Sequence, residues 1–151
     1  MKKMILTIGI FISFSQSIKA QLNVPESAVK TIHSYDSLIL AIEKDTALLR
    51  KKIIGAAESK SYKGFAFLIA NSNELSKLDI LFEDPKEERV IIYLFKNKII
   101  NISIAESNHY IINDNCFGRA GTSAGDCDEI LKSVPRYRDI VKNLLTLFFE
   151  N

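Results

Sequence analysis

The spacing of apolar residues changes near residue 60. From about Ser34, apolar residues recur at intervals of three, four or seven, as they do along one face of a helix. The pattern predicts a helix that begins near Ser34 and ends between Gly55 and Lys60. Residues 21–32, which include Pro25, show little periodicity and are expected to form an extended lead-in. The apolar stripe of the predicted helix consists of Leu38, Ile42, Leu49, Ile53 and Ala56.

Five segments after residue 60 are continuously apolar or alternate with a period of two, which is typical of β-strands. Short polar connectors separate them, and the tightest connector predicts a hairpin turn centred near Asn97. A parallel pair would need a crossover of a dozen residues or more, so the short connectors predict an antiparallel meander. The predicted strands are Tyr62–Ala70, Lys77–Phe82, Arg89–Phe95, Ile99–Ala105 and His109–Ile112.

The last part of the chain again shows helical spacing. Asp126 and Glu129 have the spacing of a capping box for one helix, and Pro135 marks the start of a second. The second stripe consists of Val134, Tyr137, Val141, Leu144, Leu145 and Phe148. We therefore predict a two-layer α+β domain with an N-terminal helix, an antiparallel meander of four to five strands, and one or two C-terminal helices that help to cover the sheet.

The first twenty residues have the layout of a secretory signal peptide. Lys2 and Lys3 precede an apolar run from Met4 to Phe14, and a polar stretch then ends at Ala20. The apolar run is too short to cross a bilayer, and no later run approaches the length of a membrane span. We expect cleavage near Ala20, a secreted or periplasmic location, and one domain over residues 21–151 without a membrane span.

Cleavage would change the charge of the protein. The whole chain has a net charge of +2, and residues 1–20 contain three lysines and no acid, so the remaining chain carries −1. A near-neutral domain lacks the strong positive charge that nucleic-acid binding depends on, and we set nucleic acid aside. The basic groups at Arg50–Lys52 and at Arg136, Arg138 and Lys142 are interpreted as solvated faces of the first and last helices.

Cys116 and Cys127 are the only cysteines, and they are eleven residues apart. In an exported protein such a pair predicts a disulfide. Closing a loop of this length would contribute roughly 3 kcal/mol to stability in the chain-entropy model. The disulfide either staples the sheet to the C-terminal helices or clasps a loop that presents Phe117 and Arg119 to a partner.

A free Cys116 would allow a different interpretation. Cys116 could then act as a nucleophile with His109 as its base and Asp114 or Glu106 as the group that orients the histidine. A disulfide would remove that nucleophile. The two histidines are far apart, and the chain has no zinc-binding spacing and no phosphate-binding loop ending in Gly-Lys-Ser/Thr, so we expect no metal and no cofactor.

These observations favour an exported, non-enzymatic domain that binds another protein, as inhibitors and immunity proteins do. The alternative is a carrier for a small apolar ligand or a lipid between the sheet and the first helix, because Tyr62–Ala70 and Arg89–Ile104 are almost continuously apolar. An enzyme of unknown type is the third hypothesis. An apolar second face of the sheet would also suit a homodimer interface.

Overall fold

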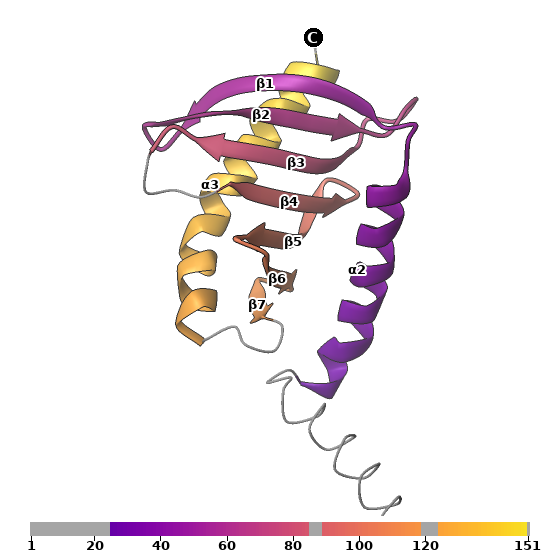
Figure 1. The fold of residues 1–151 in the computed structure, drawn as a ribbon, viewed down its shortest axis with the longest axis vertical. Helices are drawn as coiled ribbons and strands as arrows, with labels where there is room; N and C mark the ends of the chain where they lie inside the picture. The colour runs from indigo at the N-terminus through magenta and orange to yellow at the C-terminus, as the bar shows by residue number, and fades with distance from the viewer. Residues whose placement is uncertain (1–24, 85–88, 119–123, 151) are drawn as a thin grey trace, which may run out of the picture.

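The computed structural model describes residues 25–84, 89–118 and 124–150, and Figure 1 shows one sheet with a helix before it and a helix after it. The predicted signal peptide and Arg119 lie outside these described residues. Among the described residues, no helix is long and apolar enough to cross a membrane. The helices are α2 (Glu26–Lys44) and α3 (Ala124–Phe149).

The sheet is an antiparallel meander in which each strand pairs with the next strand along the chain, in the order β1 to β7. The predicted α+β class and antiparallel topology are confirmed, but the sheet has seven strands instead of four to five. The strands are β1 (Leu49–Ala57), β2 (Lys60–Leu68), β3 (Leu75–Phe82), β4 (Val90–Phe95), β5 (Lys98–Ile104), β6 (Ser107–Ile112) and β7 (Asn115–Gly118).

The N-terminal helix lies earlier in the chain than predicted. The expected lead-in is helical from Glu26, α2 ends at Lys44, and the second half of the predicted helix is strand β1. Residues four apart, such as Leu49 and Ile53, lie on one side of a strand as well as on one face of a helix. This spacing therefore did not distinguish a helix from a strand. After α2, the Asp45 carboxylate accepts a hydrogen bond from the backbone N–H of Ala47 at 2.8 Å, a local turn that separates the helix from β1.

The C-terminal region forms one helix instead of two. α3 continues through Pro135, which removes one backbone hydrogen bond but does not end the helix. Side chains on both sides of Pro135 are buried on the same face of α3, so packing against the sheet stabilises the uninterrupted helix. These buried side chains are Ile130, Val134, Tyr137, Ile140, Val141 and Leu144.

Tight hairpins connect most neighbouring strands. The predicted turn at Asn97 is confirmed, and both Lys96 and Asn97 have positive φ, as type I′ turns require. The Asn97 side chain also accepts a hydrogen bond from the Leu75 N–H and donates one to the Asn73 carbonyl, which ties the β2–β3 connection to this turn. The same pair of positive φ values occurs at Glu58–Ser59, Ala105–Glu106 and Asn113–Asp114.

The core lies between α3 and one face of the sheet, which we call the covered face. Figure 1 shows α3 crossing behind the strands. The sheet contributes alternate residues of each strand to this core, in agreement with the register of the pairs. Representative core residues are Ile53, Ala66, Leu78, Ile92, Ile102 and Ile111.

The other face of the sheet is covered only in part. α2 lies against it near β6, where Asp36 accepts a hydrogen bond from the Tyr110 hydroxyl. At the C-terminal end of α2, Glu43 accepts hydrogen bonds from the Tyr93 hydroxyl at 2.9 Å and from Lys77 Nζ at 2.6 Å. Beyond these contacts, the outward side chains of β1–β4 opposite α3 form a surface that we call the open face.

Candidate functional site

The two cysteines join the last strand to the last helix. Cys116 lies in β7 and Cys127 in the first part of α3, with their sulfur atoms 2.11 Å apart, at disulfide distance. Neither cysteine is free in the structure. The arrangement agrees with the predicted staple between the sheet and the C-terminal region.

The structure gives less support to a displayed recognition loop. Phe117 lies within β7, half-buried and paired with Tyr110, on the opposite side of the strand from Cys116. Arg119 is outside the described residues. Phe117 therefore belongs to the sheet and not to an exposed loop.

The groups of the thiol-enzyme hypothesis are not assembled as a catalytic set. Cys116 is at disulfide distance from Cys127, so no nucleophilic thiol is present in this arrangement. Asp114 lies in the β6–β7 turn, where it forms an ion pair with Arg138, while His109 lies nearer the other end of β6. Glu106 is exposed in the β5–β6 turn.

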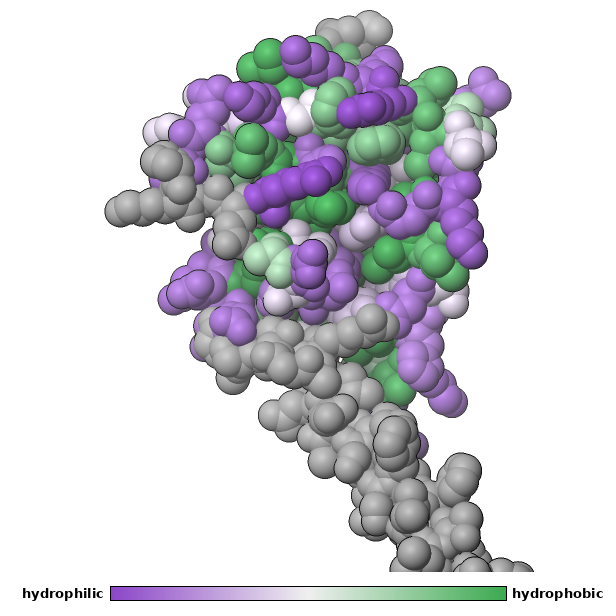
Figure 2. All heavy atoms as spheres, in the orientation of Figure 1, coloured by the Kyte–Doolittle hydropathy of each residue, from purple (hydrophilic) through white to green (hydrophobic). Residues whose placement is uncertain are grey.

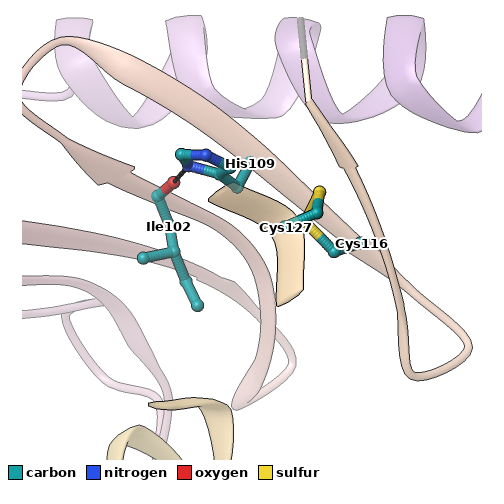
Figure 3. Close-up of a disulfide and its surroundings, with 4 residues drawn as sticks. All are labelled: Ile102, His109, Cys116 and Cys127. Carbon is teal, nitrogen blue, oxygen red and sulfur yellow. Dashed lines mark hydrogen bonds between the residues drawn. A yellow bond between two sulfur atoms is a disulfide. The ribbon is translucent and has the colours of Figure 1, made fainter. Parts of the chain in front are cut away.

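His109 is a polar residue of this region whose burial was not expected from the sequence. It is 3% exposed, and its Nδ1 lies 3.3 Å from the carbonyl oxygen of Ile102 (Figure 3). A carbonyl oxygen can only accept a hydrogen bond, so Nδ1 carries the proton and Nε2 is the acceptor in the neutral ring. Nε2 has no hydrogen-bond partner within the described part of the chain.

His109 also lines a cavity of about 440 Å³ between the first half of α3 and strands β4–β6. Arg136 lines the same cavity and is buried, although the sequence suggested a solvated helix face. Its guanidinium lies 4.4 Å from the ring centre of Phe82, a cation–π contact that accounts for its burial. Asp126 and Glu129 are exposed at the cavity wall. The cavity therefore combines charges of both signs.

Strand register arranges the side chains of the open face in rows across β1–β4. In one row, Arg50 on β1 pairs with Phe67 on β2, and Phe67 with Lys77 on β3. In the next row, Lys52 pairs with Phe65, and Phe65 with Asp79. In the third row, Ile54 pairs with Lys63, and Lys63 with Leu81. Tyr93 and Ile91 continue the first two rows on β4.

Apolar and charged side chains alternate on this face, as Figure 2 shows. Ile54 is 76% exposed and Leu81 is 43% exposed. The Arg50 guanidinium lies 3.5 Å from the ring centre of Phe65, and Lys77 Nζ lies 5.3 Å from that of Phe67. These cations lie over aromatic rings that are themselves only half-buried. The sequence missed this surface because it assigned Arg50–Lys52 to a helix.

Two acidic groups neutralise part of the positive charge. Asp79 forms an ion pair with Arg89, whose hydrogen bonds hold the pKa of the Asp79 carboxyl below its usual value despite the opposing effect of burial. Burial would raise the pKa of Glu43, but the hydrogen bonds from Lys77 and Tyr93 outweigh it and lower that pKa. Both carboxyl groups are therefore ionised at neutral pH and hold their basic partners in place.

No protein-family model matches this chain, and neither curated proteins nor solved structures gave a match. We therefore infer the function from the surfaces and groups described above.

Proposed function

We propose that this protein is an exported, non-enzymatic domain that binds another protein through its open face. The observation that carries the proposal is the incomplete cover of the sheet: α3 buries one face, whereas the opposite face of β1–β4 exposes apolar side chains among charged ones. Exposed apolar groups that are contiguous and surrounded by polar residues mark interaction surfaces on soluble proteins.

The composition of the open face suits protein recognition. Phe65 and Phe67 supply half-exposed aromatic area, and Arg50 and Arg89 are exposed basic residues of a type enriched in protein interfaces. The side chains stand on paired strands, so most of the ordering cost of a binding surface is already met by the fold. A flat, rigid surface of this kind needs no loop to create it.

The other two hypotheses find less support. The carrier hypothesis places a ligand between the sheet and the first helix, yet α2 meets the sheet there through carboxylate–tyrosine hydrogen bonds. The cavity at His109 carries charged groups of both signs, which suits an apolar ligand poorly. A second cavity reaches Tyr35 of α2 and has apolar lining residues, but Arg138 and Glu150 also border it. An enzyme based on Cys116 would require reduction of the pair with Cys127.

Site-specific photo-crosslinking tests the proposed function. A photoreactive phenylalanine analogue at position 54 or 81 should crosslink to a protein among the exported proteins of the native host. The matched controls place the same group at Leu147 or Leu40, which are exposed apolar residues on the helices. Equal crosslinking from the helix positions, or none from the sheet positions, would reject the open face as the binding surface.

A further inference from the structure

We infer that the partner presents acidic side chains next to apolar ones, and this inference rests on the proposed function. Among the described residues, the open face carries more basic groups than acidic ones. Opposite charge in the partner would compensate them and guide its approach.

The charge balance of the open face can be followed residue by residue. Its basic residues are Arg50, Lys52, Lys63, Lys77 and Arg89, whereas Asp79 is its acid. Arg89 pairs with Asp79, and Lys77 pairs with Glu43 of α2. Arg50, Lys52 and Lys63 form no ion pair with any described residue and are exposed. Within the described part of the chain, these three bases are therefore the ones that carboxylates of a partner could pair with.

These three bases surround the apolar part of the face. Arg50 and Lys52 are alternate residues of β1, so they point to the same side of the sheet. Lys52 stands opposite Phe65, and Lys63 stands opposite Ile54. A partner that packs apolar groups on Phe65 and Ile54 brings its neighbouring side chains within reach of all three bases. Carboxylates are the side chains that would satisfy them.

An acidic protein fits this face better than a nucleic acid does. Single-stranded nucleic acids bind sheets by stacking bases on open aromatic rings. Here a guanidinium lies over Phe65 and an ammonium near Phe67, so cations already occupy a face of each ring. The aliphatic side chains of Ile54 and Leu81 on the same face offer no stacking surface for bases.

Selection from a displayed random-peptide library on the immobilised protein tests this inference. Peptides that combine Asp or Glu with large apolar residues should be enriched, and their affinity should fall as salt is raised. The K52E/K63E variant should bind these peptides at least about tenfold more weakly. Arg50 is left unchanged in this variant because it stacks on Phe65. The matched control K30E/K132E reverses two exposed lysines on the helices and should bind like the wild type.

The outcomes separate the inference from the proposed function. An I54S/L81S variant removes the exposed apolar groups without altering charge. If enriched peptides lose binding to I54S/L81S but are not acidic, the open face binds proteins and the inference of acidic chemistry is wrong. If no enriched peptide depends on either pair of substitutions, the proposed function fails as well. Tight binding of a poly-dT oligonucleotide that K52E/K63E abolishes would overturn the inference in favour of nucleic acid.

Discussion

At the scale of single residues, close approach of two strands depends on the missing side chain of Gly64. A Cβ atom at this position would lie 1.9 Å from the backbone oxygen of Asp79 on β3. Backbone cannot move aside as the end of a flexible side chain can, so β2 and β3 would have to separate. Gly64 is therefore a requirement of the sheet, which the sequence alone did not indicate.

We predict that Gly64→Ala lowers the free energy of unfolding by about 1 to 3 kcal/mol, the usual range for overpacking a tight interior site. Urea unfolding followed by circular dichroism measures the change. Ser61→Ala, at an exposed position of the same strand, is the control and should change stability little. An unchanged unfolding midpoint for Gly64→Ala would show that the two strands are not as close as described.

A second residue-scale prediction concerns Asn101 in β5. Its side chain is completely buried between Tyr93 and Tyr110 of the neighbouring strands, and neither its Oδ1 nor its Nδ2 has a hydrogen-bond partner among the described residues. A buried polar group without partners costs about 1 to 3 kcal/mol. Asn101→Leu, which has the same branched shape and the same number of side-chain heavy atoms, should therefore stabilise the protein by about 1 kcal/mol in the same unfolding assay. Destabilisation would mean that the amide has an essential role under α2.

Among the elements, α2 has polar contacts with the sheet in addition to its buried Ala28 and Ile32, and the contacts of Glu43 depend on pH. The folded-state pKa of Glu43 lies below its reference value of 4.5. A lowered carboxyl pKa stabilises the fold above the unfolded-state pKa, and that contribution disappears as the pH falls through the folded-state pKa. Attachment of α2 should therefore weaken below about pH 4.5.

Glu43→Gln tests this dependence. At neutral pH it should lower the free energy of unfolding by about 1 kcal/mol, since a partly exposed charged hydrogen bond is lost. At a pH below the folded-state pKa, the wild type and the variant should be nearly equally stable. Glu150→Gln, at an exposed position beyond α3, is the control. A difference that stays constant with pH would show that the Glu43 charge does not hold α2.

The link between β7 and α3 gives another prediction at this scale. Replacing both Cys116 and Cys127 with alanine removes the covalent link between β7 and α3. The loop length predicts a loss of about 3 kcal/mol in unfolding free energy. The single substitutions should cost as much as the double one, because either removes the bond. A double variant as stable as the wild type would contradict a structural role for this pair.

Some elements of the structure could be predicted from the sequence, and others could not. Strands β2 to β6 follow from their apolar periodicity, and Asn97 identified its turn because asparagine tolerates positive φ. Glu58–Ser59 adopts the same backbone without such a residue, and the sequence did not indicate a turn there, whereas the connector predicted at Glu106–Asn108 turns at Ala105–Glu106. β1 was misassigned because its apolar spacing suits a helix equally well, and Pro135 suggested a break that tertiary packing overrides.

For the molecule as a whole, the proposed function rests on the unequal cover of the two sheet faces. Because the sequence placed Arg50 and Lys52 on a helix, it could not show that they stand beside Phe65 and Phe67. Strand register is a tertiary property, and the open face exists only once four strands are aligned. Cys116 and Cys127, which the sequence predicts to form a disulfide, lie at disulfide distance between β7 and α3, whereas the candidate contact Phe117 lies within β7. The surface best suited to a partner lies elsewhere.

The central claim is that the open face binds an acidic protein partner. Chemical-shift mapping by NMR, with an isotope-labelled protein and an acidic peptide obtained by selection, tests it most directly. Peptide-induced shifts should cluster at outward residues of β1–β4, including Lys52, Ile54 and Lys63. Shifts concentrated at the cavity around His109, or on the solvent side of α3, would contradict it.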